Sequence, residues 1–229
     1  MSTLEPTAET VLPPDVGRRP RPDAWVFIRE FARAPLRTAS VVPSSPALAA
    51  RMVQPLRRSA RQHPGPPVVV ELGPGTGAFT AALRASAPEI RYLGIELNPR
   101  MADHLAARFT GIDLVRGPAS CLPRALAERG LAAADLVLSG LPWQAFAGTA
   151  GTDLVAAIAA NLAPSGAYTQ FTYSWTRWAP PGRRQHRDLQ RFFERVELSP
   201  TVWGNLPPAV VYTATAPRRV VDIPPAGSR

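Results

Sequence analysis

The sequence predicts an α/β protein built on a doubly wound sheet of seven strands, with a terminal antiparallel hairpin and an N-terminal helical extension. Short apolar or β-branched runs alternate with helical segments from Val68 to Tyr173, which is the pattern of parallel strands joined by helices. Two further strand-like runs, 195–203 and 209–215, are joined by Gly-Asn-Leu-Pro-Pro and so predict the hairpin.

The predicted elements follow one another with short connections. We expect the five alternating strands to start at Val68 and then to cover 90–96, 112–116, 134–139 and 167–173. The helices of this part are expected at about 78–86, 99–108, 150–162 and 183–194. Two helices are expected before the first strand, near 23–37 and 46–60.

Composition divides the chain into four parts. Residues 1–22 contain five prolines and few apolar residues, which predicts a disordered arm. Residues 23–62 form the helical extension, 63–216 hold the sheet, and 217–229 are expected to be a tail. With 229 residues and 45% hydrophobic content, the chain can bury a core of ordinary size.

Several features favour a cytoplasmic protein. No run of about 18 apolar residues occurs, so no transmembrane helix is predicted. Acids and prolines precede any apolar run, which argues against a signal peptide. A single cysteine, Cys121, excludes an intramolecular disulfide framework and fits a reducing compartment. The three histidines are scattered along the chain, so no metal site is predicted.

The chain is strongly basic, with a formal charge of +9, and this favours anionic partners such as lipid head groups or nucleic acid. All 26 basic residues are arginine, which indicates a general compositional bias. The positions of the arginines are therefore more informative than their number.

A basic amphipathic helix is predicted just after the N-terminal arm. Asp23 suits its N-cap, and its arginines recur at positions 29, 33 and 37. The apolar face consists of Trp25, Phe27, Ile28, Phe31, Ala32 and Leu36. Two interpretations remain open: the apolar face packs on the domain, or the helix lies in an anionic membrane surface.

The segment Val68–Thr80 predicts a nucleotide-binding turn. A buried strand leads into Gly73, Gly75 and Gly77, and a helix follows. Glycines let a backbone approach a ligand closely, and a helix N-terminus offers free N–H groups. The spacing fits a permissive dinucleotide pattern, but Glu71 before the loop suits an ammonium or sulfonium ligand and suits a pyrophosphate badly. Glu96, about 20 residues on, suits ribose hydroxyls in either case.

The run E-L-G-P-G-T-G (71–77) resembles the first motif of the class I S-adenosylmethionine (SAM) dependent methyltransferases, which share a Rossmann-like sheet. The resemblance implies an enzyme with SAM as cofactor, bound by residues 63–216. It assigns these cofactor contacts by position: Glu71, Gly73, Gly75 and Gly77 to methionine, Glu96 and Leu97 to ribose, Ala119 and Ser120 to adenine, and Ser139 and Leu141 to the methyl group. Pro118 departs from the pattern, because many members have an acidic residue there.

Later motifs narrow the resemblance. Together V-P-S-S-P-A-L-A (42–49), I-E-L-N-P (95–99), S-G-L-P (139–142), Q-F-T-Y (170–173) and N-L-P-P-A (205–209) resemble the bacterial phospholipid N-methyltransferases, which convert phosphatidylethanolamine toward phosphatidylcholine. That family has a membrane-associating N-terminal helix, so the resemblance favours a peripheral position at the inner face of the membrane. It assigns the substrate side to Ser44, Ser45, Trp143, Tyr173 and Arg177, with Tyr173 and Ser139 as candidate catalytic residues.

Three alternatives stay open. Trp143-Gln144 and Ser174-Trp175-Thr176 depart from the phospholipid enzymes beside the substrate, which would fit a methyltransferase of small metabolites. The G-L-P-W loop also resembles RNA adenine dimethyltransferases, but no helical domain follows the last strand and Ser139 stands where an asparagine is expected, so a nucleic-acid partner is not favoured. A non-catalytic protein that binds SAM and membranes is the third alternative.

Overall fold

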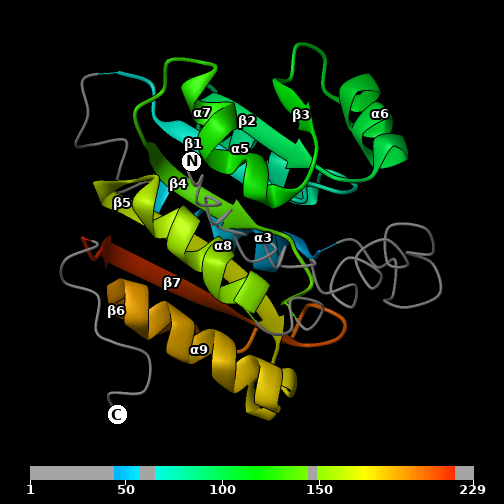
Figure 1. Cartoon of the computed structure of the whole chain (residues 1–229). Helices are drawn as coiled ribbons and strands as arrows, with labels where there is room; N and C mark the ends of the chain where they lie inside the picture. The colour runs from blue at the N-terminus through cyan, green and yellow to red at the C-terminus, as the bar shows by residue number, and fades with distance from the viewer. Residues whose placement is uncertain (1–43, 57–64, 144–148, 220–229) are drawn as a thin grey trace, which may run out of the picture.

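The computed structural model describes residues 44–56, 65–143 and 149–219. Its centre is a seven-stranded sheet of order β3-β2-β1-β4-β5-β7-β6, with helices on both faces (Figure 1). Strands β1 to β5 are parallel to one another, whereas β7 is antiparallel to both β5 and β6. The predicted doubly wound sheet with a terminal antiparallel hairpin is therefore confirmed.

The elements have the following bounds. The strands are β1 (Val68–Leu72), β2 (Arg91–Glu96), β3 (Leu114–Arg116), β4 (Ala134–Ser139), β5 (Leu162–Tyr173), β6 (Phe193–Leu198) and β7 (Ala209–Pro217). The helices are α3 (Pro46–Val53), α5 (Ala78–Ser86), α6 (Pro99–Arg108), α7 (Leu122–Ala127), α8 (Thr149–Ala160) and α9 (Pro180–Phe192). Two short 3₁₀ helices, η1 (Ala119–Cys121) and η3 (Thr176–Trp178), complete the described part.

The main differences from the predicted elements have local causes. Strand β5 begins at Leu162 because the ladder between β4 and β5 is irregular at its start and takes in the segment predicted to precede the strand. The penultimate strand was predicted to reach residue 203 but ends at Leu198, shortly before Pro200, which has no N–H to donate. Helix α7 was not predicted; it is only six residues long, although its buried residues Leu122, Ala125 and Leu126 have helical spacing. The amphipathic segment 23–37 lies outside the described residues.

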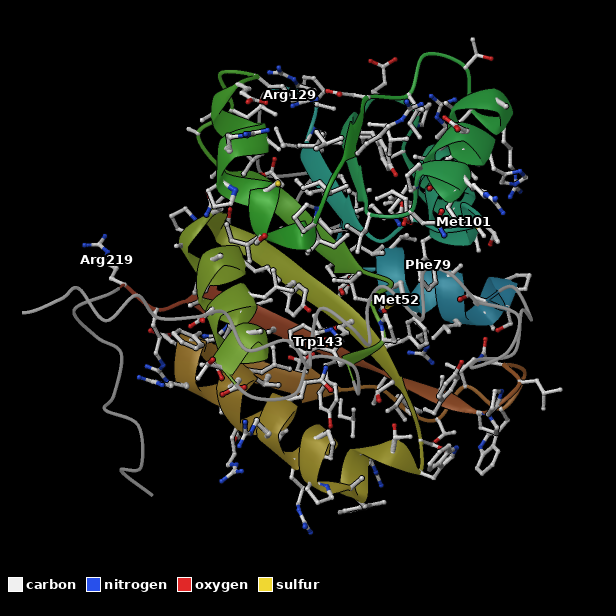
Figure 2. All side chains as sticks on the ribbon, turned by 45° about the vertical axis from the view of Figure 1, so that its right-hand side comes forward. Met52, Phe79, Met101, Arg129, Trp143 and Arg219 are labelled. Carbon is white, nitrogen blue, oxygen red and sulfur yellow. The ribbon has the colours of Figure 1, made fainter. Side chains whose placement is uncertain are left out.

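Two hydrophobic clusters form the core, one on each face of the sheet. Alternation along β1 sends Val69 to the cluster that contains α3 and α5, and Val70 to the cluster that contains α7, α8 and α9. Met52 and Phe79 belong to the first cluster and Trp143 to the second (Figure 2). Burying a side chain of this size contributes roughly 1.5–3 kcal/mol, so both helical layers are held mainly by apolar contact.

Helix α3 is attached to the sheet at both the backbone and the side-chain level. The Ser45 hydroxyl caps it by accepting the Leu48 N–H at 3.2 Å. The backbone N–H of Ser45 donates to Oδ1 of Asn205, in the connection between β6 and β7, at 2.9 Å. Leu48 and Met52 are fully buried in the cluster on the α5 face, so the chain enters the described part already packed against that face of the sheet.

Candidate active site

The glycine loop after β1 has the geometry that its sequence predicts. Gly73, Gly75 and Gly77 all have positive φ, at 68°, 54° and 82°, in the left-handed region that favours glycine. A Cβ on Gly77 would lie 2.5 Å from the Phe109 ring, so this position also requires glycine for space. Helix α5 begins at the next residue, and its first N–H groups face the loop region.

Loops from three parallel strands meet at this edge of the sheet. The Gly73 N–H donates to the carbonyl of Ile95 in β2 at 2.9 Å, and the Gly140 N–H donates to the carbonyl of Leu72 in β1 at 2.8 Å. A Cβ on Gly140 would lie 2.7 Å from the Gly73 carbonyl oxygen, which is a clash with backbone. Leu141 packs on Gly73, since a Cβ built on Gly73 would lie 2.6 Å from Cδ2 of Leu141. The S-G-L-P loop and the glycine loop therefore form one surface.

Glu96 joins this surface from the end of β2. Its Oε2 accepts the Gly75 N–H at 3.0 Å and its Oε1 accepts the Asn98 N–H at 2.8 Å. Burial raises the pKa of the Glu96 carboxyl, and these backbone hydrogen bonds oppose the rise. A carboxylate has about four acceptor positions, so those not used by the loop can accept from the hydroxyls of a ribose. The residues present thus fit the nucleoside part of SAM.

Glu71 lies on the α5 face of the sheet and is completely buried. Its Oε2 accepts from the hydroxyls of Thr80 at 2.7 Å and Tyr92 at 2.8 Å. Its Oε1 has no hydrogen-bond partner among the described residues, so one acceptor atom remains for a donor such as an ammonium group. Burial raises the pKa of Glu71 to about 7. Tyr92 reaches this carboxyl across Gly94, where a Cβ would be 2.9 Å from the tyrosine oxygen.

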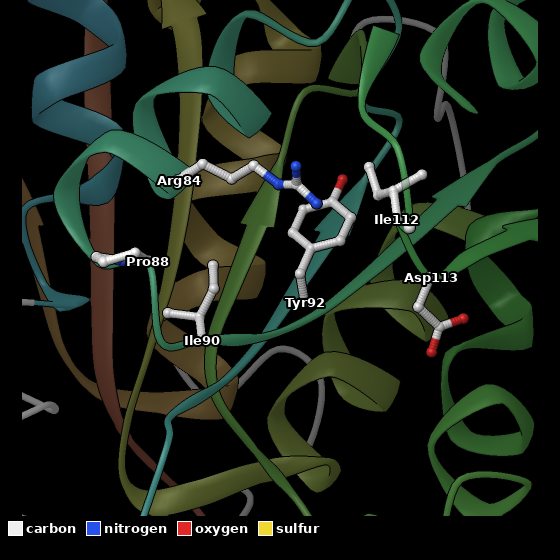
Figure 3. Close-up of a pocket in the computed structure, with 7 residues that line it drawn as sticks. Arg84, Pro88, Ile90, Tyr92, Ile112 and Asp113 are labelled. Atoms are coloured by element: carbon white, nitrogen blue, oxygen red, sulfur yellow. The ribbon is translucent and has the colours of Figure 1, made fainter. Parts of the chain in front are cut away.

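A hollow of about 320 Å³ lies beside Tyr92 (Figure 3). Its walls are Arg84, Pro88, Ile90, Tyr92, Gly111, Ile112 and Asp113. Ile90 precedes β2 and Asp113 precedes β3, so the hollow is at the amino ends of these strands. Ligands of open parallel sheets bind at the carboxyl ends, and we therefore do not assign the cofactor to this hollow.

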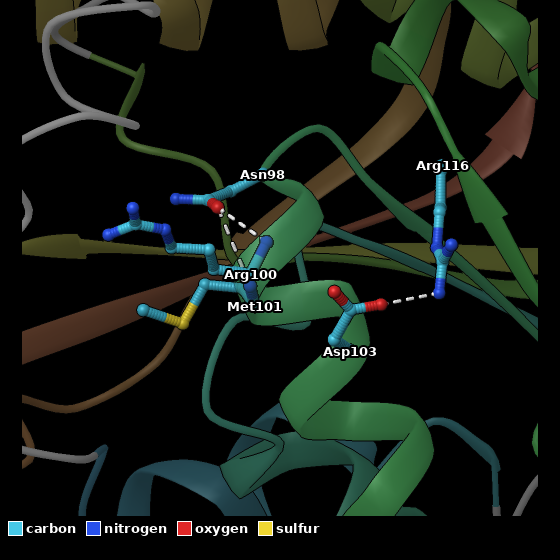
Figure 4. A network of polar contacts seen from close by, with 5 residues as sticks. All are labelled: Asn98, Arg100, Met101, Asp103 and Arg116. Atoms are coloured by element: carbon cyan, nitrogen blue, oxygen red, sulfur yellow. Dashed lines mark hydrogen bonds and ion pairs between the residues drawn. The ribbon is translucent and has the colours of Figure 1, made fainter.

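The segments after β2 and β3 place the residues predicted for the adenine side. The Asn98 side chain caps α6 by accepting the N–H groups of Arg100 and Met101, and Arg116 pairs with Asp103 across to β3 (Figure 4). The Gly117 N–H donates to the Glu96 carbonyl at 2.9 Å, which brings the start of η1 to Glu96. Of the residues predicted here, Leu97 and Ala119 are partly buried and Ser120 is exposed.

A row of polar side chains continues the site across β4, β5 and β7. Ser139 is in register with Gln170, and Gln170 is in register with Tyr212. The Tyr168 hydroxyl donates to Oε1 of Gln170 at 2.8 Å, while Nε2 of Gln170 has no partner among the described residues. Gln170 is fully buried. Gln170, Tyr168 and Tyr212 were not predicted to belong to the site; the available signal was a glutamine within the threonine- and aromatic-rich strand 167–173.

Two of the predicted substrate-side residues lie near this row. Nε of Arg177 is buried without a hydrogen-bond partner in the described part, and its guanidinium lies over the Trp178 ring at 4.3 Å. Burial raises the pKa of Tyr212, and the nearby charge of Arg177 opposes the rise. Trp143 is buried in the cluster on the same face of the sheet as Tyr212.

The other predicted substrate-side residues are placed elsewhere. Tyr173 packs edge-on against Phe171, at 6.0 Å between ring centroids, on the α3 and α5 face. The two candidate catalytic residues, Tyr173 and Ser139, therefore point to opposite faces of the sheet. The Ser139 hydroxyl accepts the Leu141 N–H at 3.3 Å, and the Ser45 hydroxyl caps α3. Ser44 is partly buried beside it, and a substrate contact by either serine stays a prediction.

The fold and this edge define a class I methyltransferase. The fold matches the O-methyltransferase from Bacillus cereus in complex with S-adenosylhomocysteine, with a TM-score of 0.57 at 14% identity over 88% of this chain and 94% of that one. It also matches precorrin-6y C5,15-methyltransferase from Geobacter metallireducens, with a TM-score of 0.57 at 16% identity over 77% of this chain and 91% of that one. No protein-family profile matches the chain.

Sequence similarity identifies the family. The chain is 34% identical over 198 residues to an ornithine lipid N-methyltransferase from Singulisphaera acidiphila, covering 83% of this chain and 94% of that protein. The chain therefore belongs to the same family of class I SAM-dependent methyltransferases as this enzyme, and the predicted enzyme class and cofactor are confirmed. Among the described residues, no helix has the length and apolar character needed to cross a membrane.

Because the pKa of Glu71 is raised, we expect a specific dependence of stability on pH. Below pH 4.5 the Glu71 carboxyl is protonated in both the folded and the unfolded chain. Between pH 4.5 and about 7 it loses its proton in the unfolded chain but keeps it in the folded one, so the free energy of unfolding falls as pH rises. The loss would be on the order of 3 kcal/mol at most and would level off above about pH 7. Urea unfolding of the wild type and of Glu71→Gln at pH 5 and pH 8 measures it, with exposed Glu89→Gln as the control. The same pH dependence in Glu71→Gln would contradict the assignment.

Replacing Glu96 should weaken SAM binding. Hydrogen bonds to a charged group contribute about 1.5–3 kcal/mol, so Glu96→Ala is expected to raise the Kd for SAM roughly tenfold to a hundredfold. Isothermal titration calorimetry with SAM measures the change, and Glu89→Ala, an exposed glutamate before β2, serves as the matched control. An unchanged Kd in folded Glu96→Ala would exclude Glu96 from the cofactor site.

Proposed function

We propose that this enzyme methylates the primary amine of a membrane lipid whose head group also carries an anionic group. The homologous enzyme is named for ornithine lipid, and the motifs resemble those of enzymes that act on phosphatidylethanolamine. Ornithine and ethanolamine phosphate share an aliphatic amine close to a carboxylate or a phosphate. The common recognition problem is therefore a pair of groups, one nucleophilic nitrogen and one oxyanion.

The observation that carries this proposal is the set of partnerless donors beside the polar row. Buried polar groups in proteins are nearly always hydrogen-bonded, so Nε2 of Gln170 and Nε of Arg177 call for acceptors that the described residues do not supply. The carboxylate or phosphate of a head group supplies such acceptors. A guanidinium bonds such oxyanions more strongly than neutral donors do. Both groups lie near Tyr212, on the face of the sheet opposite to Tyr173.

The protein's contribution to methyl transfer is binding and orientation. SAM supplies a methyl group that is already activated by its sulfonium sulfur. Glu96 and the glycine loop hold the nucleoside end, while Oε1 of Glu71 offers an acceptor for the ammonium. The Ser139 hydroxyl fixes the Leu141 loop, so we assign it a positioning role. With the leaving group activated, holding the amine in line and away from water provides much of the rate enhancement, and the amine must first lose its proton.

The acceptor can be identified directly. We expect methyl-labelled SAM to transfer its label to the lipid amine when the enzyme is incubated with vesicles that contain ornithine lipid or phosphatidylethanolamine. The two lipids are tested in separate vesicles, and mass spectrometry of the product counts the methyl groups on each. RNA and a water-soluble metabolite extract form the remaining arms. Label in the RNA or the metabolites, with neither lipid modified, would refute the proposal.

Removing the partnerless donors of Gln170 and Arg177 should lower the rate of lipid methylation more than it lowers the affinity for SAM. Gln170→Leu has nearly the same volume, and Arg177→Ala deletes the cation; each is expected to lower kcat/KM for the lipid roughly tenfold to a hundredfold with the Kd for SAM within twofold. Arg124→Ala on α7, an exposed arginine that pairs with Glu128, is the control. Equal losses of SAM binding and lipid methylation would place these residues outside the acceptor site.

A further inference from the structure

Four large apolar side chains are exposed on two loops at the carboxyl edge of the sheet. Trp175 and Trp178 follow β5 and are 65% and 66% exposed, while Trp203 and Leu206, between β6 and β7, are 78% and 70% exposed. Among the described residues Leu198 is the one other large hydrophobic side chain with comparable exposure, at 39%. Single exposed apolar residues are common, but a group of four, three of them tryptophans, marks an interaction surface.

The two loops are adjacent at the backbone. Tyr173 at the end of β5 pairs with Ala209 at the start of β7, and the Ser174 N–H donates to the Pro208 carbonyl at 2.9 Å. Figure 1 shows the connection between β6 and β7 at the same end of the sheet as the end of β5. We call the four side chains Trp175, Trp178, Trp203 and Leu206 the tryptophan surface.

The charge around the tryptophan surface is mostly positive. Residues 174–188 contain four arginines, at 177, 183, 184 and 187, and one carboxylate, Asp188, which lies close to Arg184 and Arg187. Residues 199–209 contain no charged residue. The arginines at 183, 184 and 187 are exposed on the first half of α9, next to η3. Tryptophan at the level of the head groups, with arginine beside anionic phosphates, is the composition of a membrane interface.

Charge also decides between the possible occupants of this surface. The amphipathic segment 23–37 of the same chain carries arginines at 29, 33 and 37, so its charge has the same sign as that of the tryptophan surface. An anionic bilayer has the complementary charge and an apolar layer beneath it. The chain enters the described part at Ser44, and Ser45 bonds to Asn205 between Trp203 and Leu206. The described part of the chain therefore begins beside this surface, and six residues separate segment 23–37 from it in the sequence.

We propose that the tryptophan surface docks the enzyme on an anionic bilayer and points the carboxyl edge of the sheet at the head groups. The glycine loop, the polar row and the tryptophan surface all lie at the carboxyl ends of the parallel strands. A lipid amine can then reach the cofactor without the lipid leaving the membrane. This inference rests on the proposed lipid acceptor, but docking itself is measured without any methylation.

Trp203 and Leu206 provide the cleanest test, because neither is assigned to the cofactor or to the acceptor and both are largely exposed. Binding of the full-length protein to vesicles of phosphatidylglycerol and phosphatidylethanolamine is measured by sedimentation. We expect the double variant Trp203→Ser with Leu206→Ser to bind roughly tenfold more weakly or worse, since two apolar side chains leave the bilayer. Trp203→Phe should retain binding, and Arg124→Ala on α7 should match the wild type. Vesicle binding unchanged in the double variant would overturn the proposal.

A comparison of two substrate forms separates docking from chemistry. The double variant should lose methylation of vesicle lipid in proportion to its loss of binding, yet keep the wild-type rate on a short-chain lipid present as monomers. Equal losses on both forms would overturn the docking role. Vesicle binding that depends on Trp203, with no lipid methylated by the wild type, would support docking and reject the proposed function.

A second measurement tests the alternative occupant. Iodide quenches exposed tryptophan, and the difference between wild type and Trp203→Phe isolates the signal of Trp203. We expect this signal to be equally accessible in the full chain and after removal of residues 1–37, and to be shielded when anionic vesicles are added. Accessibility that appears only after the removal would show that the chain covers its own surface, and the proposal would fall.

Discussion

The close approach of two backbone loops at Gly73 and Gly140 is the constraint on which the site depends. Strands β1 and β4 are neighbours in the sheet although more than 60 residues separate them in the chain, and their loops meet with no room for a Cβ at Gly140. Because these loops touch, the residue that follows, Leu141, covers the glycine loop. The glycine loop and the S-G-L-P loop are thus fixed relative to each other by backbone contact.

Two buried carboxylates lie close to this junction, Glu71 in β1 and Glu96 at the end of β2. Burial disfavours their charged forms and raises the pKa of each, and the two charges also repel. A protein gains little stability from such groups. SAM carries an ammonium and a sulfonium, whose charges are complementary to these carboxylates, so binding it between them would offset part of this electrostatic cost. The network of Thr80 and Tyr92 around Glu71 holds one oxygen and leaves the other available.

The terminal hairpin completes the polar row. A parallel sheet alone would end at β5, but β7 runs antiparallel to it and brings Tyr212 beside Gln170. The same connection that permits this reversal carries Trp203 and Leu206. The glycine loop, the polar row and the exposed tryptophans therefore lie at one edge of the sheet.

The sequence by itself determined the elements and the cofactor loop, because these depend on neighbours in the chain. Alternating apolar residues define strands, and a strand followed by three spaced glycines and a helix has few other conformations. Tertiary structure decided which side chains meet. Gln170 and Tyr212 are joined by a strand pairing across more than 40 residues. Ser139 is in register with Gln170, and Tyr173 is three residues after Gln170 on the same strand, so Tyr173 faces the opposite side of the sheet from Ser139. Local patterns set the period of each strand, but only packing selects the layer of helices that each face meets.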